Sequence, residues 1–213
     1  MPVPFHHPAS IVIAGPSRSG KTTFLRKLLQ QRLINPFPLR IMVVYGEWQT
    51  DYDLIRSNLP QIEFNKGPMS EELYETFDPE TTNMLILDDQ MTEAGNSTSL
   101  ERYFVQGSHH RNLTIVFIVQ NIFGKGKAIR TSTLNANYLV LYKTPRDRNQ
   151  VAILGRQMYP AKWKAFLEAF EHATQNPYTY LVVDLLPNTP EEYRLRGNMF
   201  ADAHNSPTDV YII

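Results

Sequence analysis

The chain has 213 residues, of which 42% are hydrophobic and 20% are charged, and its formal net charge is +0. This length and balance are typical of one globular domain with a sizeable core. The neutral total gives no support to a generally basic nucleic-acid-binding protein, so any DNA contact must come from local patches. Since there are no cysteines, disulfide and zinc–thiolate frameworks are excluded.

The first residues form a leader rich in proline and histidine, which does not resemble a secretory signal peptide. We expect residues 1–9 to be flexible. No apolar run is long enough to span a bilayer, so we expect no membrane span. Because the sequence has no internal repeats and no linker, we assign residues 10–200 to a single domain and residues 201–213 to a C-terminal tail.

The most informative segment is Gly15–Thr22, which fits the pattern G-x-x-x-x-G-K-[ST]. A short β-branched run at 10–14 precedes it, and apolar residues at helical spacing follow it, which predicts a strand, a glycine-rich loop and a helix. In that arrangement, backbone N–H groups and the positive end of the helix face a triphosphate. The predicted nucleotide-binding residues are Gly15, Pro16, Ser17, Arg18, Ser19, Gly20, Lys21, Thr22 and Thr23.

Two of these residues have chemical roles of their own. Lys21 is expected to reach the β- and γ-phosphates, and the Thr22 hydroxyl is expected to ligate Mg²⁺. The helix should end near Ile34, because the prolines at 36 and 38 cannot continue it. The next pattern predicts a strand, a helix, a strand and a helix, at 40–45, 52–57, 62–65 and 70–77.

Two adjacent carboxylates follow the apolar strand predicted at 83–87. Asp88 is the candidate that holds Mg²⁺ through a water molecule, and Asp89 is the candidate general base or water-orienting group. Neighbouring residues in a strand point in opposite directions, so one carboxylate can face the metal while the other faces the attacking water. The alternative is that the two aspartates only begin a turn.

A capping box at 98–101 predicts a further helix. The strand that follows this helix also ends in polar residues. The strand predicted at 114–119 ends in Gln120 and Asn121. Gln120 is the candidate sensor of the γ-phosphate, and Asn121 is the alternative candidate for this role. The alternative is an amide that only caps the strand.

Further strands are predicted at 138–142 and 178–184, with a helix between them that Pro160 opens. Near-continuous apolar strands that alternate with helices predict an α/β fold with a mostly parallel central sheet sandwiched by helices. Ligands bind such sheets at the carboxyl ends of the strands. The glycine-rich loop, the paired aspartates and Gln120 all come at predicted carboxyl ends.

Three arginines are candidates for a finger that completes a neighbouring subunit's site: Arg111, Arg146 and Arg148. Each could instead be a surface arginine. A flexible basic loop offers three residues that could contact DNA phosphates, or could simply be solvated: Lys125, Lys127 and Arg130. Trp48 and Tyr52 could stack on a base, although packing is the commoner role for such aromatics.

Several segments give the chain a specific resemblance: 104–112, 119–123, 144–147, 178–184 and 195–198. Together they resemble the genome-packaging ATPases of polintons, adintoviruses and virophages. These ATPases are related to the poxvirus packaging ATPase and lie in the FtsK/HerA branch of P-loop ATPases. The resemblance covers the chain from about Ser10 to Phe200.

The resemblance implies a RecA-like core in which the Gln120 strand lies between the P-loop strand and the Asp88 strand. It also implies ATP and Mg²⁺ as cofactors and a ring homo-oligomer, a hexamer, that pumps double-stranded DNA into a preformed capsid through a portal or vertex. Such a protein would act inside an infected cell, in the nucleus or a viral factory. It could be virion-associated and would not be secreted.

Position by position, the two Walker motifs of these ATPases match Lys21 and Thr22, then Asp88 and Asp89, and their polar sensor matches Gln120. One departure is that the wider superfamily often has glutamate where this chain has the shorter Asp89. For the arginine supplied in trans, Arg111 is the first choice because it precedes the sensor strand.

Other classes of P-loop protein fit the sequence less well. A P-loop kinase or other nucleotide phosphotransferase would need a lid with arginines and an acceptor pocket. A GTPase would need an Asn-Lys-x-Asp motif, and the segment 65–68 reads Asn-Lys-Gly-Pro. A scaffold that binds ATP only to assemble would not need both catalytic motifs.

Overall fold

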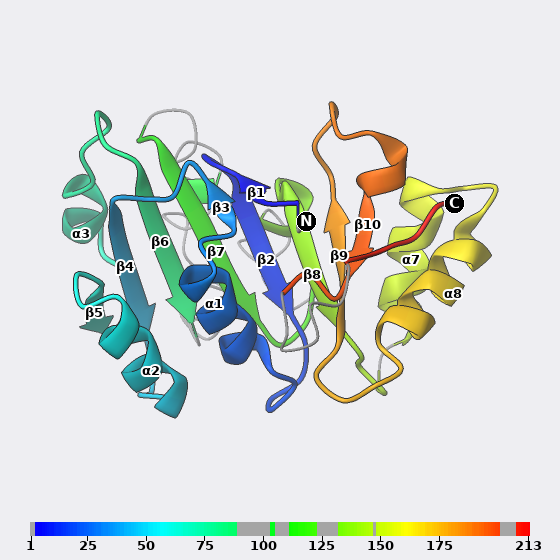
Figure 1. Cartoon of the computed structure of the whole chain (residues 1–213), viewed down its shortest axis with the longest axis horizontal. Helices are drawn as coiled ribbons and strands as arrows, with labels where there is room; N and C mark the ends of the chain where they lie inside the picture. Colours follow the sequence, from blue (N-terminus) through cyan, green and yellow to red (C-terminus); the bar gives the residue numbers. More distant parts are fainter. Residues whose placement is uncertain (1–2, 89–102, 105–110, 123–131, 147, 201–207) are drawn as a thin grey trace.

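The computed structural model describes residues 3–88, 103–104, 111–122, 132–146, 148–200 and 208–213. Figure 1 shows a central sheet with helices against it. The helical elements are α1 (Lys21–Gln30), α2 (Thr50–Asn58), α3 (Glu71–Glu75), α7 (Arg148–Met158), α8 (Trp163–Ala173) and the 3₁₀ turn η1 (Glu191–Tyr193). The strands are β1 (Phe5–His6), β2 (Ser10–Ala14), β3 (Ile34–Asn35), β4 (Arg40–Tyr45), β5 (Glu63–Lys66), β6 (Asn83–Asp88), β7 (Leu113–Val119), β8 (Tyr138–Tyr142), β9 (Tyr180–Asp184), β10 (Leu195–Gly197) and β11 (Asp209–Val210).

Most of the described strands join one sheet, in the order β11-β10-β9-β8-β2-β7-β6-β4-β5. From β8 to β5 all neighbours are parallel, whereas β9, β10 and β11 continue the sheet as antiparallel strands. The predicted α/β fold with a mostly parallel sheet is confirmed. So is the implied strand order, because β7 lies between β2 and β6.

Burial on both faces explains why the central strands read as continuous apolar runs. In β2, Ile11 and Ile13 point to a core that includes apolar residues of α1 and α2. Val12 and Ala14 point to the opposite core, which includes residues of α3, α7 and α8. Helices therefore cover both faces, and the parallel strands all bring their carboxyl ends to one edge.

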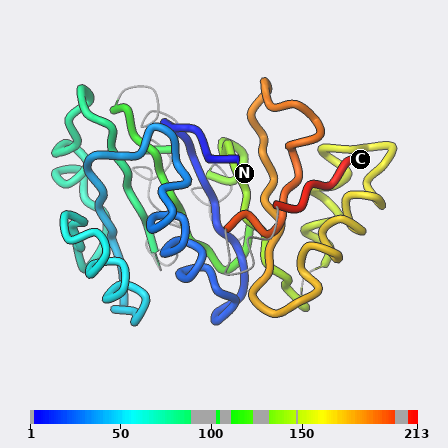
Figure 2. The backbone as a smooth tube through the Cα atoms, in the orientation of Figure 1, coloured from blue at the N-terminus to red at the C-terminus, as the bar shows by residue number. Residues whose placement is uncertain are grey.

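The N-terminal segment contains a short strand that we did not predict. β1 pairs in parallel with β3, and the Phe5 side chain is fully buried. Its ring packs edge-on against Tyr138, with ring centroids 4.7 Å apart. Figure 2 shows this segment at the upper end of the sheet, away from the loop between β2 and α1.

Two helices also differ from expectation. α1 ends at Gln30 and not near Ile34, because Arg32 adopts a left-handed φ of 50° and the chain then pairs as β3. α7 was not predicted, although its buried Val151 and Leu154 have helical spacing. The helix expected from 98 lies outside the described residues, apart from 103–104. None of the described helices is long and apolar enough to cross a membrane.

The antiparallel extension contains a charged pair in its interior. Arg196 of β10 is fully buried, and its guanidinium lies 3.0 Å from an Asp184 carboxylate oxygen on β9. The other Asp184 oxygen accepts hydrogen bonds from Leu186 N and the Thr189 hydroxyl.

The C-terminal tail contains a strand that we did not predict from sequence. This strand, β11, pairs with β10 at the edge of the sheet.

Candidate functional site

The loop after β2 has the backbone that its motif requires. Gly20, which precedes the first residue of α1, has φ 101° and ψ 14°, a left-handed conformation that glycine adopts without steric cost. Arg18 is also left-handed, with φ 64°. The loop thereby turns the N-terminus of α1, with its unpaired N–H groups and positive dipole, towards the carboxyl edge of the sheet.

Lys21 folds back over this loop. Its ammonium donates to the carbonyl oxygens of Gly15 and Pro16, at 2.7 and 2.9 Å. These bonds hold a positive charge beside the N-terminus of α1. The arrangement suits the predicted contact between Lys21 and phosphate oxygens.

Tyr142, the last residue of β8, packs against the glycine-rich loop. A Cβ on Gly15 would lie 2.5 Å from Tyr142 Cβ, so no larger residue fits there without a shift. The Tyr142 hydroxyl donates to the Gly20 carbonyl at 3.1 Å. Burial, and secondarily the nearby Tyr180, raises the pKa of Tyr142, so this hydroxyl keeps its proton.

A chain of hydrogen bonds joins the two predicted Mg²⁺ ligands. The Thr22 hydroxyl donates to Gln49 Oε1 at 2.6 Å, and Gln49 Nε2 donates to Asp88 Oδ2 at 3.1 Å. The same Asp88 oxygen accepts a 2.5 Å hydrogen bond from the buried Tyr52 hydroxyl. Asp88 and Thr22 therefore lie on opposite sides of one amide group, although they are far apart in sequence.

The donor set fits a magnesium ion. A hydroxyl and a carboxylate are hard oxygen ligands of the kind that Mg²⁺ prefers, with phosphate and water oxygens completing its octahedron. Thr22 and Asp88 would hold the ion, and Gln49 lies between them. The described residues contain no cluster of three or more histidines and acidic residues that would suggest another metal.

A second contact fixes the start of α1 against α2. Asp51 accepts from the Thr23 hydroxyl at 2.8 Å and from Arg26 Nε at 2.8 Å. Together with Gln49 in the loop after β4, this carboxylate ties the start of α2 to α1. Sequence reasoning missed Gln49 and Asp51. The signal that could have found Gln49 is its position just after the strand that neighbours the Asp88 strand.

The groups meet at a cleft of about 500 Å³ at the carboxyl edge of the sheet. Gln120 lines it from the end of β7 and is exposed, as a residue that contacts a ligand requires. The cleft is lined by Ser17, Arg18, Gly20, Lys21, Thr22, Thr23, Gln49, Asp51, Asp88, Ile118, Val119, Gln120 and Tyr178. The structure therefore brings Lys21, Thr22, Asp88 and Gln120 together, as the motifs predict.

The three candidate arginines lie at two different places. Arg111 precedes β7, at the opposite end of the sheet from the cleft, where it forms an ion pair with Glu75 and donates to the Phe77 carbonyl at 3.1 Å. Arg146 and Arg148 follow β8 at the cleft end, and both are exposed. Whether any of them acts on a neighbouring subunit stays a prediction.

Several other predicted residues lie outside the described part of the chain. They are the proposed base, Asp89, and the proposed DNA contacts, Lys125, Lys127 and Arg130. Trp48 and Tyr52 belong to an aromatic cluster with Tyr45 and Phe64, in which neighbouring rings lie 5.1–6.4 Å apart. Tyr52 is fully buried, so the packing interpretation is right for it.

No protein-family model and no curated protein matches this sequence. Solved structures do match it. The chain is similar to the genome-packaging NTPase B204 of Sulfolobus turreted icosahedral virus 2 in complex with ATPγS, with a TM-score of 0.59 and 14% identity over 89% of this chain and 96% of B204. The AMPPCP complex of that protein gives a TM-score of 0.56 and 11% identity over the same shares.

A third structure, B204 described as the DNA-packaging ATPase from Sulfolobus turreted icosahedral virus, gives a TM-score of 0.57 and 14% identity over 83% of this chain and 92% of that one. At identities this low, the TM-scores establish a shared fold and nothing more. The chain therefore has the α/β fold of these viral NTPases. In this chain a glycine-rich loop, a strand-end aspartate and a strand-end glutamine meet at one cleft.

Proposed function

We propose that this chain is an ATP-hydrolysing motor subunit that translocates double-stranded viral DNA into a preformed capsid. The observation that carries the proposal is the single cleft that Lys21, Thr22, Asp88 and Gln120 line together. The strand order supports it, because a polar side chain ends the strand between the loop and the aspartate. The fold shared with B204, a genome-packaging NTPase, supports the packaging role.

The chemistry follows from the positions of these groups. The N–H groups at the start of α1 and the Lys21 ammonium would bind the β- and γ-phosphates of ATP. Mg²⁺ held by Thr22 and, through water, by Asp88 would neutralise charge on the phosphate oxygens. Asp89 would orient the attacking water, and Gln120 would respond to loss of the γ-phosphate.

The assembly that we propose is a ring, a hexamer, in which a neighbour's arginine completes each site. Arg146 and Arg148 are exposed at the cleft end. Arg148 would have to leave an ion pair with Glu171, and Arg111 one with Glu75. Lys125, Lys127 and Arg130 would contact the DNA backbone, and a portal or vertex of the capsid would receive the DNA. The ring would work inside an infected cell.

The narrower relationship to the packaging ATPases of polintons, adintoviruses and virophages, and through them to the poxvirus enzyme, is also a proposal. Its support is the sequence alone, in the segments 104–112 and 119–123. An ATPase that packages DNA in another virus group would share the same cleft chemistry.

ATP hydrolysis with and without duplex DNA, on protein fractionated by size, tests the function. We expect hydrolysis in a ring-sized fraction and stimulation by DNA. Lys21→Ala and Asp89→Asn should each lower kcat/KM roughly 10²–10³-fold, while Lys66→Ala, an exposed lysine on the edge strand, should change nothing. An active monomer that ignores DNA would refute the motor. Phosphate transfer to a small molecule would favour a phosphotransferase instead.

Mixing inactive variants tests the arginine in trans. Lys21→Ala keeps its arginines but loses its own site, whereas an arginine variant keeps its site but loses the finger. If the arginine acts on a neighbour, mixed rings regain part of the activity that both variants lack alone. The same mixture should stay inactive if the arginine serves only its own subunit.

A further inference from the structure

A second hollow, of about 330 Å³, opens beside the phosphate cleft. The two share three lining residues: Gly20 and Thr23 at the start of α1, and Tyr178 just before β9. These shared residues lie between the two cavities, so the hollow adjoins the cleft. A ligand whose phosphates lie at Lys21 and Thr22 could therefore extend past Thr23 into it.

Aromatic rings form the walls of this hollow. Phe24 packs edge-on against Tyr180 and Phe200, with ring centroids 4.7 and 4.9 Å apart. The Tyr142 hydroxyl donates to the Gly20 carbonyl, and the Tyr180 hydroxyl accepts from Met199 N at 3.1 Å. Burial raises the pKa of both tyrosines, so these two hydroxyls keep their protons and stay neutral. Such walls suit a flat, apolar and aromatic group.

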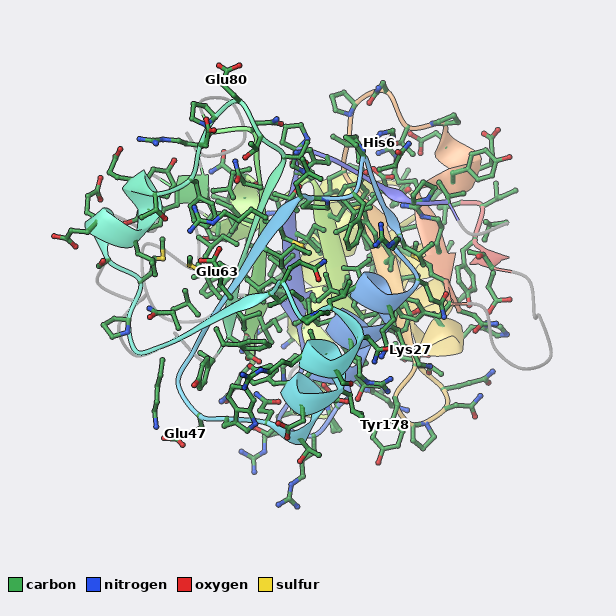
Figure 3. The ribbon with its side chains drawn as sticks, turned by 60° about the vertical axis from the view of Figure 1, so that its left-hand side comes forward. His6, Lys27, Glu47, Glu63, Glu80 and Tyr178 are labelled. Atoms are coloured by element: carbon green, nitrogen blue, oxygen red, sulfur yellow. The ribbon has the colours of Figure 1, made fainter. Side chains whose placement is uncertain are left out.

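Tyr178 stands at the mouth of the hollow and is unusual in two respects. Its side chain is 71% exposed, although it lies among buried aromatics. Its backbone is left-handed, with φ 67°, which is uncommon for a residue other than glycine and is a form of strain that clusters at ligand-binding sites. Figure 3 shows it on the same lower side of the molecule as Lys27, which also lines the hollow.

The position of Tyr178 relative to the loop is close. A Cβ built on Gly20 would lie 3.4 Å from Tyr178 Cδ1, so the ring lies directly beside the residue that precedes α1. A base stacked on this ring would lose water from one face, and the ring would lose part of its exposed surface. Stacking of a base on an aromatic side chain contributes more than most single contacts in nucleotide binding.

We propose that the hollow lined by Phe24, Tyr142, Tyr178, Tyr180 and Phe200 is the nucleoside pocket, and that a purine base stacks on the exposed ring of Tyr178. The inference rests on the proposed function, because it assumes that the neighbouring cleft binds the triphosphate. It assigns the base to the Tyr178 side of the loop. In the other aromatic cluster, Trp48 packs edge-on against the buried Tyr52 of α2.

Two ligands separate base binding from phosphate binding: ATP and inorganic tripolyphosphate, each with Mg²⁺, titrated by calorimetry. Tyr178→Ala should weaken ATP binding about tenfold, the size expected for loss of one stacking contact, and leave tripolyphosphate binding unchanged. Tyr178→Phe keeps the ring and should bind ATP within about twofold of the original chain. Tyr193→Ala, at another exposed tyrosine, is the matched control.

Each other outcome has a definite meaning. Equal weakening of both ligands by Tyr178→Ala would show that the residue supports the loop and does not bind the base. No weakening of either would place the base elsewhere. If the unaltered chain bound tripolyphosphate as tightly as ATP, the nucleoside pocket would be refuted while phosphate binding stood. If it bound neither ligand, the proposed function itself would fail.

Discussion

Removal of the Gln49 side chain tests the organisation of the cleft most directly. The amide joins the Thr22 hydroxyl to the Asp88 carboxylate through hydrogen bonds of 2.6 and 3.1 Å. Because the amide occupies the space between Thr22 and Asp88, a Mg²⁺ ion held between these two groups would have to move it aside, and both bonds would be lost. We therefore expect Gln49→Ala to destabilise the nucleotide-free protein and, at the same time, to tighten Mg²⁺-dependent binding of nucleotide.

The magnitude follows from the two bonds. A hydrogen bond to a charged group contributes about 1.5–3 kcal/mol, and a neutral one about 0.5–1.5 kcal/mol. Gln49 is only half-buried, so water replaces part of both interactions in the variant. We expect a net loss of about 1–2 kcal/mol of unfolding free energy. If that loss is confined to the free protein, binding tightens roughly five- to thirtyfold.

Urea unfolding without nucleotide measures the first effect, and calorimetric titration with a non-hydrolysable ATP analogue measures the second. The titration is done with Mg²⁺ and with EDTA, because the gain should disappear when no ion displaces the amide. Gln61→Ala removes the same side chain from an exposed site and is the control. Weaker Mg²⁺-dependent binding by Gln49→Ala would refute the reasoning, since the amide would then assist the ion.

Three further predictions concern the fold that carries the cleft. Arg196→Met leaves the buried Asp184 carboxylate without its ion-pair partner, so urea unfolding should show a loss of about 3–5 kcal/mol; a loss too small to measure would contradict that. Burial lowers the pKa of His7, so the unfolded chain takes up the proton first and stability should fall as the pH drops below about 6.5. His7→Gln should flatten that slope in thermal melts, and an unchanged slope would assign it to other groups. Gly15→Ala places a Cβ 2.5 Å from Tyr142 Cβ, and calorimetry should show weaker nucleotide binding with a stability loss of about 1–3 kcal/mol; an equally stable variant would count against the rigid packing described above.

The parallel part of the sheet could be predicted because its strands are buried on both faces. Their apolar runs end in polar residues where the chain reaches the cleft, as at Asp88. β10 could not be predicted in the same way. It has three residues with Arg196 in the middle, and an arginine ordinarily indicates an exposed position. Its burial depends on Asp184, twelve residues earlier on the neighbouring strand.

The candidate site likewise contains residues that could be predicted from sequence and residues that could not. Lys21 and Thr22 follow from a local motif, so their positions could be predicted without knowledge of the fold. Gln49 contacts groups 27 and 39 residues away, and its only signal in the sequence is its position just after a predicted strand. Arg111 was chosen because it precedes the sensor strand. That choice also places it at the far end of β7, about 23 Å from the cleft for seven residues at 3.3 Å each.

The close packing of Gly15 against β8 bears on how the glycine-rich motif should be interpreted. Every amino acid except glycine carries a Cβ, and the obstacle at Gly15 is the Cβ of Tyr142 itself. Trimming Tyr142 to alanine would therefore not make room for a side chain at position 15. In this chain the first glycine of the motif is required by the close packing of the end of β2 against β8. Only the later residues of the motif are explained by the ligand. A chain that kept this glycine but had lost Lys21 and Thr22 would retain the architecture of a nucleotide site without its chemistry.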